Sequence, residues 1–177
     1  MYWGITSISV GILNLLLMLG VIRRVNRNAE AVRRTSDVFE GPPAIAVGQE
    51  VGTFAATTVD GDPISRESLL DDSVVAFLSP HCPPCLDKIP GFIQYAKELP
   101  SGRDQVLAVA LGSTESTAEM VADLAPVSQV VVEEHTGALS KAFEVTAFPT
   151  LVRVAVTGDG RVVIADNNVR LDLSGVR

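Results

Sequence analysis

The sequence predicts an α/β domain with a mixed sheet and helices on both of its faces, preceded by one N-terminal transmembrane helix. Three observations predict it. Short apolar runs alternate with helical patterns over about residues 73–145, the last two strand-like runs meet at Gly158-Asp159-Gly160, and the chain opens on a long uncharged apolar run. Strands that alternate with helices and then close on a hairpin give both parallel and antiparallel pairs in one sheet.

The apolar run, Ile5 to Ile22, predicts an uncleaved anchor over residues 1–22. Its 18 residues contain no charge, and at about 1.5 Å each they span about 27 Å, close to the hydrocarbon core of about 30 Å. No Lys or Arg precedes the run, and Arg23 and Arg24 follow it where a signal peptide needs small residues. A buried core helix is the alternative for a run of this length.

Charge is unevenly distributed along the chain. The net charge is −7, of which residues 1–40 carry +2, so the remainder carries −9. A domain this acidic is a poor partner for nucleic acid, and we expect none. The arginines beside the anchor suit lipid phosphates, which makes the bilayer an expected partner.

The same arginines bear on topology. All five follow the apolar run: Arg23, Arg24, Arg27, Arg33 and Arg34. The positive-inside rule, taken alone, therefore places the soluble domain in the cytoplasm.

Residues 23–46 are expected to form a juxtamembrane helix and a linker. Apolar residues recur at helical spacing in the first part, and the stretch from Glu40 to Gly52 contains two prolines and three glycines that interrupt a helix. The globular domain is therefore placed at residues 47–177.

The elements of that domain follow from local pattern and turn signals. In chain order we expect a hairpin over 54–65 around Asp60-Gly61, a buried strand over 73–79, a helix over about 82–99, a buried strand over 105–112, a helix over 113–125, a strand over 128–134, a short helix over 136–145, and two strands joined at Gly158-Asp159-Gly160.

The only two cysteines, Cys82 and Cys85, stand where the first buried strand gives way to a helix. The first turn of a helix has free N–H groups and the positive end of the macrodipole, which favour a thiolate at Cys82. Pro83 and Pro84 suit that turn because an N–H group there would have no intrahelical partner. Cys82 is the predicted nucleophile and Cys85 the resolving thiol.

Two other uses of the pair stay open. A structural disulfide across so short a loop would constrain the unfolded chain little. A zinc site needs about four ligands, and the cysteines and histidines of the chain are only Cys82, Cys85, His81 and His135. We expect no metal and no cofactor at a redox pair of this kind.

The stretch "VVAFLSPHCPPCLDKIP", followed far downstream by "VTAFPTLVRV", resembles the thioredoxin superfamily. Cys82 and Cys85 match its redox motif, Pro90 its helix-kinking proline and Pro149 its cis-proline. The resemblance implies a thioredoxin-like fold in which Phe148 and Pro149 face the disulfide and present the substrate peptide.

The anchor and the opening hairpin are similar to those of TlpA/ResA-like and MauD-like membrane-anchored thiol-disulfide oxidoreductases. This resemblance implies an enzyme of the cell membrane, single-pass, with an extracytoplasmic domain, protein disulfide or dithiol substrates and a membrane electron donor. Its extracytoplasmic placement conflicts with the arginines that follow the anchor.

The chain departs from the superfamily at three places. His81 replaces the Trp before the first cysteine and, with Pro83 and Pro84, could tune the Cys82 thiolate. Ala76 replaces the buried carboxylate that accepts the proton of the second thiol. After the last strand too few apolar residues remain for a full closing helix.

Two further functions remain as alternatives. A non-catalytic accessory or metal-delivery protein on the same fold would use His81, Cys82, Cys85 and His135. A peroxiredoxin would require Pro at position 75, where Val75 stands, although Ser79 fits its motif. The sequence does not fix the direction of electron flow, because redox potential depends on how well the reduced form is stabilised.

Overall fold

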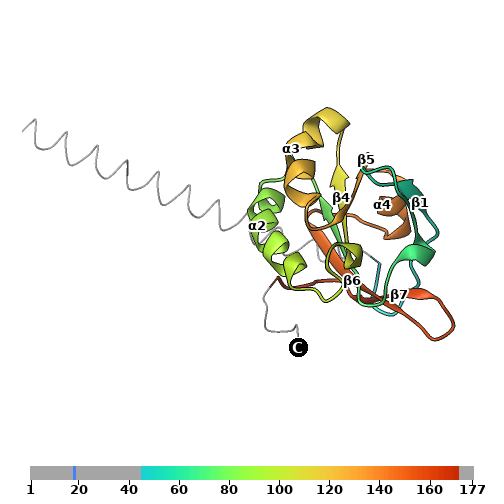
Figure 1. Ribbon diagram of the computed structural model, residues 1–177. Helices are drawn as coiled ribbons and strands as arrows, with labels where there is room; N and C mark the ends of the chain where they lie inside the picture. The colour runs from blue at the N-terminus through green and yellow to red at the C-terminus, as the bar shows by residue number, and fades with distance from the viewer. Residues whose placement is uncertain (1–17, 19–44, 172–177) are drawn as a thin grey trace, which may run out of the picture. The chain divides into compact units, whose positions relative to one another are not determined.

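The computed structural model describes Met18 and residues 45–171. Residues 45–171 form an α/β domain (Figure 1). Apart from Met18, the predicted anchor and the juxtamembrane segment up to residue 44 lie outside the described residues. Within the described part, no helix is both long enough and apolar enough to cross a bilayer.

The elements confirm the order expected from sequence. They are β1 (Ala55–Thr57), β2 (Pro63–Ser65), the 3₁₀ turn η1 (Arg66–Ser68), β3 (Val74–Leu78), α2 (Pro83–Lys97), the 3₁₀ turn η2 (Gly102–Gln105), β4 (Val106–Leu111), α3 (Thr114–Leu124), β5 (Gln129–Glu133), α4 (Ala138–Ala142), β6 (Thr150–Val156) and β7 (Val162–Asp166).

Five of the strands form one mixed sheet in the order β5-β4-β3-β6-β7. The pairs β3·β4 and β4·β5 are parallel, whereas β3·β6 and β6·β7 are antiparallel. β1 and β2 pair separately as an antiparallel hairpin. The central strand β3 is buried along its whole length, which explains its continuous apolar sequence.

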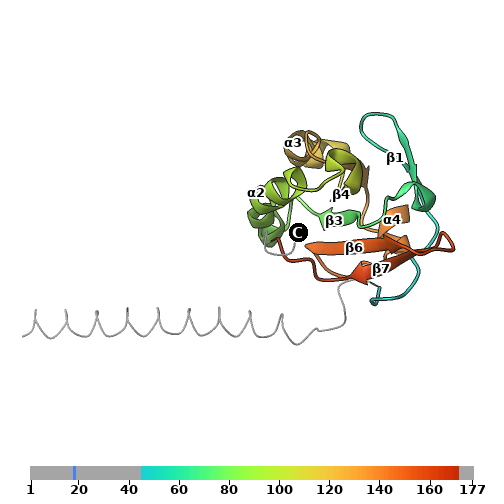
Figure 2. The ribbon, with the colours of Figure 1, turned by 60° about the horizontal axis from the view of Figure 1, so that its bottom comes forward.

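The two faces of the sheet carry side chains of different size. On one face the strands present three alanines, Ala76, Ala108 and Ala110, among larger residues such as Leu78 and Leu151, and this face packs against α2 and α3. On the other face they present Phe77 and Leu107, among other large side chains, and this face packs against α4 and the N-terminal segment. Both views place α2 with α3 on one side of the sheet and α4 on the other (Figures 1 and 2). Small residues let the backbones of helix and sheet approach closely, while large ones fill the side that has only a short helix.

A buried contact fixes the C-terminal half of α2 to the sheet. The Arg153 guanidinium on β6 donates a hydrogen bond to the Tyr95 hydroxyl at 2.7 Å, and it also pairs with Asp72 at 3.2 Å. Burial raises the pKa of Tyr95, while the charge of Arg153 opposes that rise. Tyr95 therefore stays a neutral anchor for the helix whose N-terminus carries the cysteines.

A short extended segment follows β7 within the described residues, as the expected lack of a closing helix implies. Val169 is only 4% exposed and packs in the cluster that contains α2. Its N–H donates to the carbonyl of Leu151 on β6 at 3.2 Å, and the Leu171 side chain lies against Gly91 of α2. Two apolar residues thus cover part of the sheet face beside the cysteine helix.

Val169→Ala is expected to lower the free energy of unfolding by about 2 kcal/mol, because two buried methyl groups are lost and a cavity remains. The matched control is the exposed neighbour Arg170→Ala, for which we expect a change within about 0.5 kcal/mol. Urea denaturation of the purified chain, followed by far-UV circular dichroism, measures the free energy of unfolding of both variants. Equal effects of the two substitutions would show that residues 167–171 do not cover the core in solution.

Candidate active site

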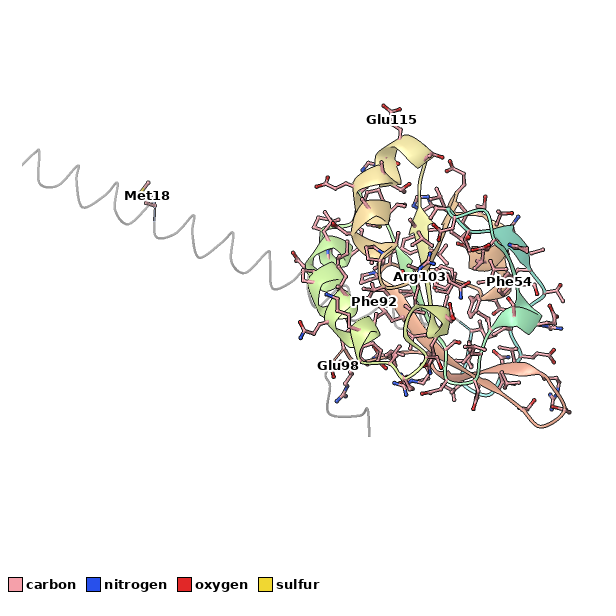
Figure 3. The ribbon with its side chains drawn as sticks, viewed as in Figure 1. Met18, Phe54, Phe92, Glu98, Arg103 and Glu115 are labelled. Carbon is pink, nitrogen blue, oxygen red and sulfur yellow. A yellow bond between two sulfur atoms is a disulfide. The ribbon has the colours of Figure 1, made fainter. Side chains whose placement is uncertain are left out.

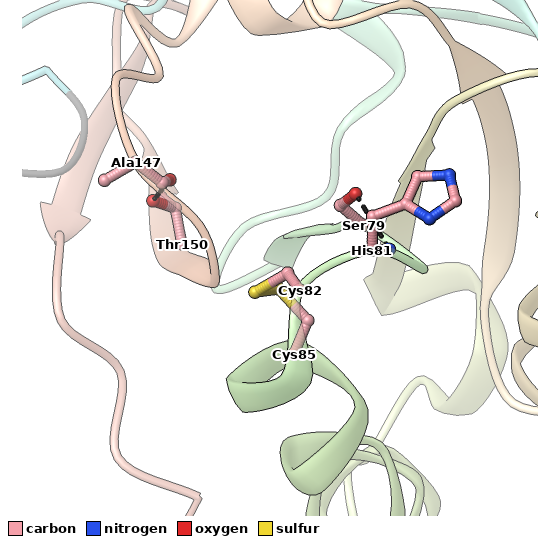
Figure 4. Close-up of a disulfide and its surroundings, with 6 residues drawn as sticks. All are labelled: Ser79, His81, Cys82, Cys85, Ala147 and Thr150. Atoms are coloured by element: carbon pink, nitrogen blue, oxygen red, sulfur yellow. Dashed lines mark hydrogen bonds between the residues drawn. A yellow bond between two sulfur atoms is a disulfide. The ribbon is translucent and has the colours of Figure 1, made fainter. Parts of the chain in front are cut away.

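Cys82 and Cys85 form a disulfide at the start of α2, with Cα atoms 5.2 Å apart (Figure 4). Cys82 is the N-cap residue of the helix and is partly exposed, whereas Cys85 is 0% exposed. β3 ends at Leu78, and the Cys82 N–H donates to the Ser79 carbonyl at 3.2 Å, which closes the turn between strand and helix. Cys82 is therefore partly accessible to solvent, while Cys85 is enclosed by the core.

The two prolines change what the helix N-terminus can offer to Cys82. Pro83 and Pro84 occupy the first two helical positions and carry no N–H group. The N–H of Cys85 donates to the Cys82 carbonyl at 2.9 Å. An N-cap side chain normally accepts from the second or third helical residue, so one of those two donors is missing and the other is engaged by a carbonyl oxygen.

A loop that leads into β6 lies on the side of the disulfide to which the sulfur atoms point (Figure 4). The peptide bond between Phe148 and Pro149 is cis. The Thr150 hydroxyl donates to the Ala147 carbonyl at 2.6 Å, and this bond closes the loop. Phe148 is half-buried and packs against the clusters on both faces of the sheet. The structure thus brings the predicted substrate-presenting residues next to the cysteine turn.

His81 is exposed, and its ring points away from the sulfur atoms (Figure 4). Its backbone N–H lies 3.4 Å from the hydroxyl of the buried Ser79, at the long end of hydrogen-bond distance. The imidazole makes no hydrogen bond to Cys82 in this disulfide form. A tuning role for His81 stays a prediction.

His135 belongs to the surroundings of the site, although the sequence suggested it only as a metal ligand. Its ring contacts the ring of Phe148 edge-on, with centroids 5.4 Å apart. The Glu133 carboxylate accepts hydrogen bonds from the N–H groups of Leu139 and Ser140 and so fixes the loop that carries His135. Sequence spacing gave no signal for this contact, because 13 positions separate the two aromatic residues.

Two further features of the sequence concern the position of the superfamily's buried acid and the candidate metal ligands. Ala76 and Cys85 belong to the same apolar cluster, so the site of the superfamily's acid holds only a methyl group. Among the residues that the structure describes, no group of three or more His, Cys, Asp and Glu side chains could hold a metal ion. The set of His81, Cys82, Cys85 and His135 is therefore not gathered into one site.

Comparison with known families and curated proteins identifies relatives. The profile of the AhpC/TSA family matches residues 47–166. The sporulation thiol-disulfide oxidoreductase A of Bacillus subtilis (strain 168) is 25% identical over 100 residues. That match covers 55% of this chain and 61% of the relative, so the chain spans less than two thirds of that protein.

Two solved structures share the fold. The MTB protein dsbF, seen in mixed oxidized and reduced forms, has a TM-score of 0.54 at 24% identity and covers 67% of this chain and 87% of its own. A secreted Mycobacterium tuberculosis disulfide oxidoreductase homologous to E. coli DsbE has a TM-score of 0.53 at 21% identity and covers 67% and 89%. At these identities the likeness concerns the fold.

In the reduced protein, iodoacetamide is expected to label Cys82 and to leave the buried Cys85 largely unlabelled.

Pro84→Ala restores the N–H at the second helical position, where it can donate to the Cys82 thiolate. A charge-assisted hydrogen bond raises the thiolate fraction about tenfold at pH 7, and the lower nucleophilicity of a stabilised thiolate reduces the gain in rate to about threefold.

Mass spectrometry of the alkylated peptide gives both rates. Pro83→Ala is the matched control, because the N–H it restores lies at a position that an N-cap side chain does not use. Equal acceleration by the two substitutions would show that the prolines act on the thiolate in some way other than the missing donor.

Proposed function

The chain belongs to the AhpC/TSA family, whose profile covers residues 47–166, and on that basis we propose that it is a membrane-anchored thiol-disulfide oxidoreductase that reduces or exchanges disulfides in exported proteins through Cys82 and Cys85. A homologue, the sporulation thiol-disulfide oxidoreductase A of Bacillus subtilis, carries this activity in its name.

One observation supports the activity above the others: the two cysteines of a single disulfide differ in exposure at a helix N-terminus. Cys82 is partly exposed and Cys85 is fully buried one turn further. A substrate disulfide can reach only Cys82, so the mixed disulfide forms there. Cys85 then lies within reach of the Cys82 sulfur, because the two already form a bond in the oxidised protein.

The reductive reaction balances as a two-step exchange. The Cys82 thiolate attacks one sulfur of the substrate disulfide, a new S–S bond forms, and the other substrate sulfur leaves as a thiolate. The Cys85 thiolate then attacks the Cys82 sulfur and releases the second substrate thiolate. Two electrons pass from the protein dithiol to the substrate, and the two protons of the dithiol end on the substrate thiols.

The first turn of α2 supports the reductive direction. A protein dithiol is a strong oxidant when its reduced form is stabilised, chiefly as a thiolate. Here Pro84 removes one donor to that thiolate and the Cys82 carbonyl engages the next. Ala76 leaves the buried Cys85 without a carboxylate to accept its proton. Each feature disfavours the thiolate form and therefore favours giving electrons away.

The membrane part of the proposal rests on residues outside the described ones. The apolar run Ile5 to Ile22 is long enough to cross a bilayer. A dithiol that reduces exported proteins must be on their side of the membrane and must be reduced again by a membrane electron donor. We therefore place the domain outside the cytoplasm, against the positive-inside rule.

Replacing the nucleophile tests the activity. In detergent, the full chain is expected to accelerate reduction of insulin by dithiothreitol, and Cys82→Ser to return the rate to that of dithiothreitol alone. Cys85→Ser is expected to accumulate a mixed disulfide between Cys82 and insulin, since a hydroxyl cannot resolve it. Equal rates for the wild type and Cys82→Ser would instead support a non-catalytic accessory protein.

A reporter fusion tests the topology. Alkaline phosphatase joined to Arg177 is expected to be active in intact cells, because that enzyme forms its disulfides only outside the cytoplasm. The control lacks residues 1–22 and should be inactive, since the anchor also serves as the export signal. An inactive full-length fusion that is fully expressed would place the domain in the cytoplasm, as the arginines indicate.

A further inference from the structure

A groove of about 310 Å³ lies between α2 and α3, beside the cysteine turn. The two helices run side by side on the same face of the sheet (Figures 1 and 2). The lining residues are Pro80, Leu86, Ile89, Pro90, Ser116, Glu119, Met120 and Asp123.

The groove begins within one helical turn of the nucleophile. The Leu86 N–H donates to the Cys82 carbonyl at 3.2 Å, and Pro80 precedes Cys82 by two residues. Leu86 is 46% exposed. A partly exposed leucine one helical turn from Cys82 is an apolar contact point for a partner that approaches this cysteine.

The rim formed by α3 is acidic and unpaired. Glu119 and Asp123 line the groove one turn apart, and Glu115 continues the same stripe into solvent (Figure 3). α3 contains no Lys or Arg, and none of its carboxylates forms an ion pair within the described residues. Like charges four residues apart destabilise a helix slightly, so a cationic partner would relieve a cost that the isolated domain bears.

We propose that this groove receives the chain segment that flanks the reacting cysteine of a protein substrate, and that it selects segments combining an apolar side chain with Lys or Arg. The inference rests on the proposed oxidoreductase activity and adds its substrate class. An extended peptide advances about 3.3 Å per residue, so residues two to five positions from the substrate cysteine extend about 7 to 17 Å from it. Arginine suits the rim best, because its guanidinium can engage a carboxylate through two parallel hydrogen bonds.

Substrate recognition would then involve two parts of the domain: the loop with Phe148 and Pro149, and the groove between α2 and α3. The loop lies on the side to which the sulfur atoms point and holds the backbone next to the cysteine. The groove between α2 and α3 would bind side chains further along the substrate. Backbone contacts give affinity without sequence preference, whereas the apolar floor and the charged rim supply the preference.

Two synthetic peptides with the same internal disulfide test the proposal. One continues from its second cysteine with Gly-Leu-Lys-Arg and the other with Gly-Leu-Glu-Glu. For the full chain in detergent at low ionic strength, with dithiothreitol as the reductant and its uncatalysed rate subtracted, we expect kcat/KM to be about tenfold higher for the basic peptide, falling toward equality at about 0.5 M salt. Equal values at low salt would overturn the inference.

Variants assign the preference to the groove. E119Q/D123N is expected to reduce the tenfold ratio to about twofold, because the two negative charges of the rim are lost. The ratio of the two peptides is compared within one variant, so it does not depend on how much active protein the sample contains. The control D62N/E98Q removes two exposed carboxylates elsewhere on the domain that form no ion pair within the described residues, and it should keep the ratio. If the control loses the ratio as well, net charge and not the groove determines selection, and the proposal fails.

Other outcomes are equally decisive. If E119Q/D123N reduced both peptides faster than the wild type, the groove would be occupied by the arginine-rich residues 23–34 of this chain, which would overturn the proposal. If the wild type reduced neither peptide, or did so without Cys82, the oxidoreductase function itself would fail. If it reduced both through Cys82 without preference, only the groove assignment would fail.

Discussion

The antiparallel pairing of β3 with β6 is the interaction on which the site depends. Phe77 opposes Thr150 in this pair. The C-terminal end of β3, which leads into the cysteine turn, therefore lies beside the N-terminal end of β6, which follows Pro149. Two segments more than 60 residues apart in sequence become neighbours through this one register. A slip by one residue would turn Phe77 and Val75 to the opposite face and separate the loops.

That register is held by the difference between the two faces of the sheet. Alanines on one side accept α2 and α3 at close approach, and large side chains on the other fill the space beside α4. Phe77 would not fit beneath α2, and Ala76 would leave a void beneath α4. The same small face admits Cys85 at full burial, so the packing that fixes the fold also separates the resolving thiol from solvent. Val169 completes that face where the superfamily uses a helix.

The chemistry of the site follows from what surrounds the two sulfurs. The cysteine turn offers few donors because of its prolines, and among the described residues no Asp or Glu is buried beside Cys85. Both features make the dithiol a better electron donor than a thiolate-stabilising site would be. Next to this weakly polar centre stands an acidic helix face, α3, whose charges are unpaired within the described residues. The proposed recognition of substrates by their flanking residues rests on this reactive centre and the charged groove beside it.

Local sequence patterns were enough to predict the order and type of the elements, the cysteine pair at a strand-to-helix junction and the strand turn at Gly158. These features depend on local periodicity, turn chemistry and helix capping, which act within a few residues. Four features emerged from the folded structure alone: Cys82 is the more exposed cysteine, His81 turns away from the sulfurs, His135 contacts Phe148, and α2 and α3 enclose an acidic groove. These facts depend on contacts between segments that are distant in sequence, and the pairing of strands brings those segments together.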